Sequence, residues 1–293
     1  EPMIGTVSLV GRRAAVCAGI LVALFLPAAG EEPPAAESWK KTTRQWIETV
    51  APGKRLLLVN PHGDVYVRFG GYENRVEIVA TIQRLEPSLP PLTVAFRQVE
   101  AGLEATVGPE GSSDPEFPAV PGIEKTRDRV DLAVFVPKGV ALHVRTGEGR
   151  MEIKGLESDL DAESVKGDIR IAKIKGRVQA RSERGAIVAM LEAGATAESQ
   201  ELTTSTGDIT VHLWEDAKAT VRIATSGEIA TDYSLQVERR RFEEPGKHAV
   251  AVVGEGGPEL SLLSKRGNVR LLWQPRHFKR EDAAKPAGGP PAE

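Results

Sequence analysis

Three segments from the middle of the chain share one pattern: TGEGRMEI at 146–153, SVKGDIRI at 164–171 and SERGAIVA at 182–189. Each segment begins with a hydroxyl side chain, has a glycine three residues later, and carries apolar side chains two and four residues after that glycine. Alternation of this kind predicts a β-strand with one buried face. The pattern therefore predicts a repeated unit in which a strand follows a glycine corner.

The same register extends over seven glycines. An apolar side chain comes two positions after every one of them, and an apolar side chain five positions before six of them indicates a second strand. The glycines that share this register are Gly63, Gly149, Gly167, Gly185, Gly207, Gly227 and Gly267. Glycine can adopt the positive φ of a corner, and a short polar side chain nearby can bond the turning backbone. We interpret these glycines as structural turn residues.

The spacing of the glycines sets the size of the unit. From residue 149 to 227 they lie 18, 18, 22 and 20 residues apart, which is the length of one solenoid coil. We predict an all-β fold, a β-helix or solenoid-like stack of coils of about 20 residues with flanking antiparallel strands. An antiparallel sandwich is the alternative, because it also alternates and turns often. Aromatic residues make up only 5% of the chain, as a narrow aliphatic interior requires.

The remaining segments are less regular. The flanking strands are expected at 75–83, 92–99, 102–107 and 129–136, with a polar loop at 109–128, and residues 233–258 are expected to be an excursion within one coil. The predicted organisation is a signal peptide at 1–30, a linker and first strand at 31–50, a flanking β part at 51–140, the coil stack at 141–274 and a disordered tail at 275–293.

The first thirty residues have the order of a secretory signal. Arg12 and Arg13 precede an apolar run at 14–26, and small residues at 28–30 suit cleavage before Glu31. The run is shorter than the roughly 20 residues of a membrane-spanning helix. The sequence thus predicts an exported protein, in the periplasm or at the cell surface, whose membrane contact is limited to the export signal.

Composition excludes several classes of function. The formal net charge is -3, which argues against nucleic acid as a partner. The single cysteine, Cys17, lies in the predicted signal, so the mature chain would form no disulfide or thiolate metal site. The histidines at 62, 143, 212, 248 and 277 show no HxxxH or HxH spacing. We therefore predict no metal site and no cofactor.

The segment VPKGVALHVRTGEGRMEIKGL at 136–156 and the closing SKRGNVRLL at 264–272 resemble the bacterial "putative adhesin" family of β-helical repeat domains of unknown function. The S/T-x-x-G-D-I units that begin at Ser164 and Thr204 share the resemblance, which covers residues 56–272. It implies an exported all-β repeat domain near the cell envelope. It supplies no catalytic residues.

Charged side chains on the coils are the candidate functional residues. Lys166, Arg184, Arg170 and Arg181 could form a strip that contacts an anionic glycan or phospholipid head group. Acids interleave with these cations, which favours a solvated mixed-charge face instead. A column of Asp64, Asp168 and Asp208 follows the glycines, and we expect these residues to cap turns because calcium usually takes six to eight oxygens.

Asp159 and Asp161, with Glu157 nearby, are the residues on which a carbohydrate-active enzyme could depend. Since Leu160 between them is expected to point inward, both aspartates are expected to face solvent, and we predict no catalytic residues. The function that we predict is a non-catalytic envelope or surface protein that binds an unknown protein or polysaccharide. A carbohydrate-active enzyme and an accessory protein of an envelope-stress pathway stay open as alternatives.

Overall fold

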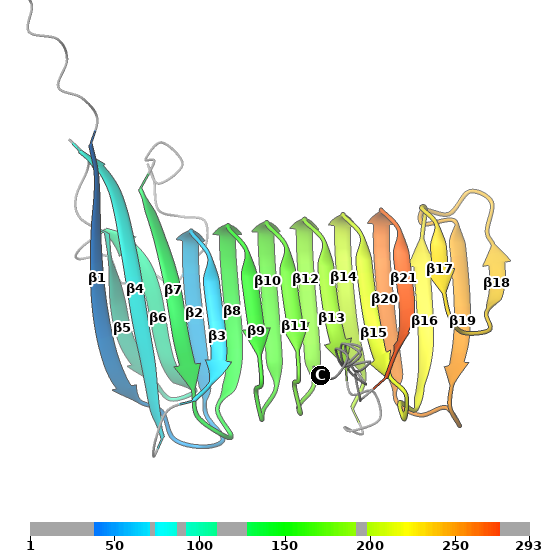
Figure 1. The fold of residues 1–293 in the computed structure, drawn as a ribbon, viewed down its shortest axis with the longest axis horizontal. Helices are drawn as coiled ribbons and strands as arrows, with labels where there is room; N and C mark the ends of the chain where they lie inside the picture. The colour runs from blue at the N-terminus through cyan, green and yellow to red at the C-terminus, as the bar shows by residue number, and fades with distance from the viewer. Residues whose placement is uncertain (1–37, 71–73, 87–91, 110–127, 192–197, 276–293) are drawn as a thin grey trace, which may run out of the picture. The chain divides into compact units, whose positions relative to one another are not determined.

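The computed structural model describes residues 38–70, 74–86, 92–109, 128–191 and 198–275 (Figure 1). Within these ranges the regular structure is entirely β-strand, and the strands form two sheets. We call the ten-stranded one sheet 1 and the eleven-stranded one sheet 2. The described part of the chain has no helix that could cross a membrane. The predicted signal peptide and most of the predicted tail and loop at 109–128 lie outside the described residues.

Each central coil places one strand in sheet 2 and, after a glycine corner, one strand in sheet 1. These coils are β8 (Ala141–Glu148) with β9 (Met151–Lys154), β10 (Leu160–Lys166) with β11 (Ile169–Ala172), β12 (Val178–Arg184) with β13 (Ile187–Leu191), and β14 (Gln200–Thr206) with β15 (Ile209–Trp214). Neighbouring coils pair in parallel and in a constant register, so that Ile169 lies between Met151 and Ile187. The predicted stack of coils is confirmed.

Two further coils and three antiparallel strands form the N-terminal end of the stack. The strands are β2 (Arg55–His62) with β3 (Val65–Phe69), β6 (Gly102–Pro109) with β7 (Arg129–Val136), and the antiparallel β1 (Ser38–Thr49), β4 (Arg75–Glu86) and β5 (Leu92–Val99). The expected flanking strands are present, but β6 and β7 pair in parallel with β2 and β3 and so make a full outer coil. Trp46 of β1 and Phe96 of β5 touch, with ring centroids 5.7 Å apart, and pack against the core.

At the C-terminal end the order of the coils departs from the order of the sequence. The strands here are β16 (Ala219–Thr225), β17 (Ile229–Thr231), β18 (Gln236–Arg239), β19 (Lys247–Val253), β20 (Glu259–Arg266) and β21 (Val269–Gln274). The last coil, β20 with β21, lies between β14/β15 and β16/β17 (Figure 1). Residues 233–258 are thus not an excursion within one coil. They contain β18 and β19, which pair antiparallel and extend sheet 2 beyond β16. This hairpin covers the edge of β16, which would otherwise offer unpaired backbone groups.

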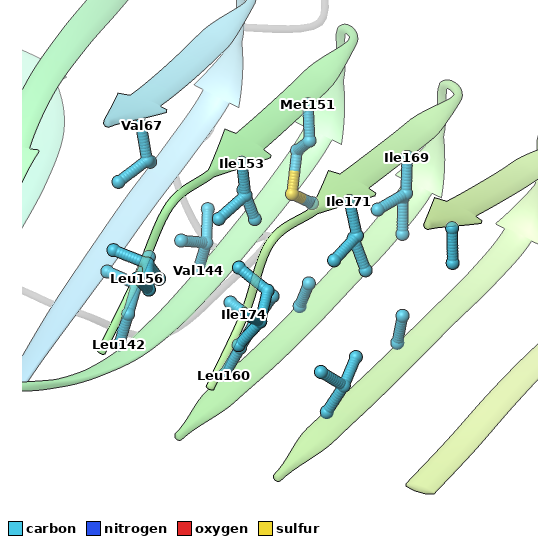
Figure 2. Packing of buried hydrophobic residues seen from close by; sticks show 14 of the residues in the cluster. Val67, Leu142, Val144, Met151, Ile153, Leu156, Leu160, Ile169, Ile171 and Ile174 are labelled. Carbon is cyan, nitrogen blue, oxygen red and sulfur yellow. The ribbon is translucent and has the colours of Figure 1, made fainter. Parts of the chain in front are cut away.

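The core lies between the two sheets and is built from small aliphatic side chains. Val144 of sheet 2 and Met151 and Ile153 of sheet 1 are fully buried, and Figure 2 shows the labelled side chains of the two sheets pointing toward one another. Facing sheets pack about 10 Å apart, which leaves room for aliphatic side chains and little room for rings. The low aromatic content predicted this narrow interior.

The glycine corners form a column in which each residue touches the glycine of the neighbouring coil. A Cβ atom at Gly167 would lie 1.8 Å from the carbonyl oxygen of Gly149, and a Cβ at Gly267 would lie 2.0 Å from that of Gly207. Gly167 has a φ of 151°, whereas Gly267 lies outside the left-handed region. Close approach of the backbones therefore requires glycine at each of these seven corners, and a positive φ, which the sequence suggested as the reason, applies to only some of them.

Several of the polar side chains before the glycines donate hydrogen bonds to the neighbouring coil. The Ser264 hydroxyl donates to the carbonyl of Gly207 (2.8 Å), and the Thr204 hydroxyl donates to that of Gly185 (3.1 Å). Both side chains are fully buried or nearly so. Since a buried hydroxyl needs a partner, these bonds explain why short polar residues recur at this position.

Candidate functional site

The aspartates that follow the glycines bond to the next coil in the stack. The Oδ1 atom of Asp64 accepts from the backbone N–H of Arg150 (2.7 Å), and Oδ1 of Asp168 accepts from Ala186 (3.0 Å). The Oδ1 atom of Asp208 accepts from Asn268 in the same way (2.8 Å). These bonds use oxygens that a calcium ion would need. The column therefore holds the corners together, as a turn-capping role requires.

Asp208 gives this column a pH dependence. The backbone N–H of Asn268, its side-chain amide and the Arg270 guanidinium stabilise the carboxylate, so the pKa of Asp208 lies below its ordinary value of 3.8. A lowered pKa in the folded state means that the carboxylate stabilises the fold above pH 3.8 and that this contribution is lost as the pH falls through the lowered pKa.

We expect Asp208→Asn to lower the free energy of unfolding by about 1 kcal/mol at pH 7, because the amide can still accept the N–H but carries no charge. The difference from the wild type should shrink as the pH falls below 3.8. Urea unfolding at several pH values measures it. A difference that stays constant into strong acid would show that the charge of Asp208 has no role.

The four cations of the predicted strip do not share a face. Lys166 and Arg184 stand side by side at the corner between the sheets, but Arg170 lies on the outside of sheet 1 and Arg181 on the outside of sheet 2. Lys166 also pairs with Glu148 (2.5 Å), and this hydrogen bond holds the pKa of Glu148 below its usual value. Binding of an anionic ligand by these four residues stays a prediction.

Two of the three acids at 157–161 have hydrogen-bond partners within the stack. Glu157 binds Lys175, and that hydrogen bond lowers the pKa of the carboxyl group. The Oδ1 atom of Asp159 accepts from the backbone N–H of Arg177 (2.9 Å). A glycosidase needs one carboxyl group whose pKa is raised so that it can donate a proton. The pKa of Glu157 is shifted in the opposite direction, to below its usual value.

The outer face of sheet 2 is a surface of ion pairs between neighbouring strands, which we call the mixed-charge face. The pairs that cross it are Arg97–Glu104 (2.6 Å), Arg145–Glu163 (3.0 Å), Arg181–Glu201 (3.5 Å) and Arg222–Glu259 (2.8 Å). Most of these side chains are a third or more exposed, so each pair contributes little to stability. Of the four cations of the predicted strip, Arg181 belongs to this face.

One cluster of side chains on this face was not predicted by the search for sequence motifs. His143 of β8 lies directly beside Asp161 of β10, and the His143 Nε2 atom is 3.9 Å from carboxylate oxygens of both Asp161 and Glu163. These residues lie 18 and 20 positions apart in the chain, a distance that no single-strand motif covers. The coil length itself is the signal that could have found them.

The outer face of sheet 1 differs from the mixed-charge face. A row of neighbouring side chains runs across four strands, and we call it the apolar row: Ala172, Met190, His212 and Leu272. Each of the four is partly exposed. Val188 and Thr210 stand next to this row on the same face, with Arg170 and Arg270 on either side of them. Across these four strands the apolar row contains neither a carboxylate nor a lysine or arginine, and Lys154 of β9 borders it beside Ala172.

A pocket of about 480 Å³ lies at the C-terminal end of sheet 2, against β16, β18, β19 and β20. Glu238 is the only acid among its lining residues, and its hydrogen bond with Arg240 lowers the pKa of that carboxyl group. The pocket therefore lacks the pair of carboxyl groups that glycoside hydrolysis uses.

Stacked parallel coils with a constant corner column and two flat outer faces define a β-solenoid-like repeat protein, a class suited to extended surfaces. The chain belongs to the Toastrack DUF4097 family, whose model matches residues 124–272. The family resemblance predicted from the sequence is thereby confirmed, and this family has no assigned activity.

Solved structures with a similar arrangement come from bacteria. A "putative cell adhesion protein" from Clostridium sporogenes is 13% identical, with a TM-score of 0.38, over 80% of this chain and 100% of its own. A "putative adhesin" from Bacteroides fragilis is 12% identical, with a TM-score of 0.30, over 80% of this chain and 97% of its own. A "putative adhesin" from Parabacteroides merdae is 12% identical, with a TM-score of 0.27, over 79% of this chain and 96% of its own. A search of curated proteins finds no match.

Proposed function

We propose that this chain is a non-catalytic, exported protein of the bacterial cell envelope or cell surface that binds a protein or polysaccharide through the outside of its coil stack. The observation that carries the proposal is the apolar row on sheet 1. Its four side chains face outward, although the interior is already filled by a continuous aliphatic core. An apolar stretch that the core does not use is a feature of interaction surfaces.

The contrast between the two faces supports the choice of surface. Interfaces are enriched in methionine and aromatic side chains and are poor in lysine and glutamate. The apolar row contains a methionine and neither lysine nor glutamate, whereas the charges of the mixed-charge face are neutralised in exposed ion pairs. A partner would gain more free energy by covering Met190 and Leu272 than by displacing water from the ion pairs.

Export is supported by the order of residues 12–30, which is that of a signal peptide. Adhesin-like binding at the envelope is consistent with the names of the bacterial structures above. No contact among the described residues favours the carbohydrate-active enzyme, because Asp159 is used by a backbone N–H and Glu157 by lysine. A role as an accessory protein in envelope stress would use the same binding surface.

Photo-crosslinking can test which face binds. A photoreactive amino acid is placed either at Thr210, beside the apolar row, or at Thr203, on the mixed-charge face of the same coil. Both side chains are partly exposed, so the two variants differ mainly in the face that they report. Each purified protein is mixed with a bacterial envelope fraction and irradiated.

We expect crosslinked envelope material from the Thr210 variant at several times the yield from the Thr203 variant. Introducing a charge with Met190→Glu should reduce that yield without changing the melting temperature, because the side chain is outside the core. Equal yields from the two faces, or crosslinks from Thr203 alone, would contradict the proposed surface.

A further inference from the structure

The carboxylate–histidine cluster, which consists of His143, Asp161 and Glu163, has the arrangement of a metal site. One ligand atom from each residue lies within 4.8 Å of the other two. His143 stands on β8 and both acids stand on β10, where they share the outward side of the strand. Two rigid, directly paired strands therefore hold the three side chains over one point of the sheet.

Two polar atoms of the cluster lack a hydrogen-bond partner. The Nε2 atom of His143 and the Oδ1 atom of Asp161 are shielded from solvent and find no partner in the part of the chain that the structure describes. The nearest carboxylate oxygens are 3.9 Å from Nε2, which is too long for a hydrogen bond. Buried polar atoms are normally paired, and here an unpaired nitrogen and an unpaired carboxylate oxygen on adjacent strands are both able to bind a ligand.

Two other histidines among the described residues do not share this property. The Nδ1 atom of His62 lies 2.8 Å from the carbonyl oxygen of Asp128, and Nε2 of His248 lies 3.0 Å from that of Pro245. Each of those nitrogens must carry a proton to bond a carbonyl, and so it has no lone pair for a metal. His143 Nε2 is engaged in no such bond.

We propose that His143 Nε2, Asp161 and Glu163 bind a divalent first-row transition metal ion, with zinc as the representative, and that water completes the coordination. One imidazole nitrogen with two carboxylate oxygens suits zinc or manganese, whereas calcium prefers oxygen ligands alone. In a tetrahedral zinc site the ligand atoms are about 3.3 Å apart. The side chains are 24–33% exposed and therefore free to close the remaining gap.

Arg145 positions one ligand of this site. Its Nε atom donates to Oε2 of Glu163 (3.0 Å), and the other oxygen, Oε1, is the one that faces His143. A hydrogen bond to the second oxygen of a ligating carboxylate is a common way to fix its orientation. The metal site lies on the mixed-charge face, on the opposite side of the stack from the apolar row, and it does not depend on the proposed function.

Calorimetric titration of the full chain with zinc chloride tests the proposal, with manganese and calcium chlorides in parallel. We expect one zinc ion per chain, weaker manganese binding and no calcium binding. Either His143→Gln or Asp161→Asn should weaken zinc binding at least about tenfold, since each removes a ligand. The matched control is His248→Gln, which removes a histidine whose Nε2 atom bonds the carbonyl oxygen of Pro245, and should leave zinc binding unchanged.

Thermal unfolding separates a lost ligand from a lost fold. Zinc should raise the melting temperature of the wild type and of His248→Gln, and it should leave that of His143→Gln unchanged. Without zinc, the melting temperatures of the three proteins should agree, because these side chains are on the surface. No zinc binding by the wild type, or binding that His143→Gln does not weaken, would overturn the proposal.

Discussion

Replacing Gly167 by alanine should lower the free energy of unfolding by about 3 kcal/mol or more, one of the largest effects expected for a single methyl group in this protein. The added Cβ would lie 1.8 Å from the carbonyl oxygen of Gly149, and the residue has a φ of 151°. Neither coil can move away alone, because the strands on both sides of the corner are held in parallel pairing. Denaturant unfolding of the purified variant measures the change.

Substitutions at two other glycines distinguish the effect of the contact between coils from the effect of the positive φ. Gly53 has a φ of 80° but open space around its Cβ position, so Gly53→Ala should cost only about 1 kcal/mol. Gly267 lies outside the left-handed region but would place its Cβ 2.0 Å from the carbonyl of Gly207, so Gly267→Ala should be nearly as damaging as Gly167→Ala. If Gly53→Ala and Gly267→Ala have equal effects, the contact between coils is not the reason for glycine.

The repeat and its register were predictable from the sequence because every coil repeats the same local requirements. A corner that touches its neighbour requires glycine, and a strand with one buried face requires alternation. The order of the coils was not predictable in the same way. Val221 and Leu260 present equivalent inward side chains, and the apolar pattern does not distinguish a coil that follows β15 from one inserted beside it.

The candidate sites were also predictable from the sequence only in part. Outward positions such as His143 could be assigned from alternation alone, and the outer side of sheet 2 carries ion pairs such as Arg145–Glu163. The cluster of His143 with Asp161 and Glu163 depends on which residues of neighbouring coils lie side by side. A search for metal motifs within one strand therefore missed it, whereas a search at the coil spacing of 18 residues would bring His143 and Asp161 together.

A chain that ends at Gly257 should lose the C-terminal end of the stack as well as its own last coil. The last coil, β20 with β21, contributes four inward side chains that are almost completely buried: Leu260, Leu262, Val269 and Leu271. Their burial is worth on the order of 6–12 kcal/mol. Without this coil β16 has no parallel partner in sheet 2, and β17 has none in sheet 1.

Hydrogen exchange can locate this loss. We expect the amides of β16, β17 and β19 to exchange like those of an unfolded chain, while the amides of β8 to β13 stay protected, because each coil contacts mainly its neighbours. A chain that ends at Pro275 retains every described strand and should match the full chain. If β16 stays protected in the shorter chain, it has docked directly onto β14, since the shared register permits that pairing. In that case the inserted position of the last coil would be a preference among equivalent stacking orders and not a condition for folding.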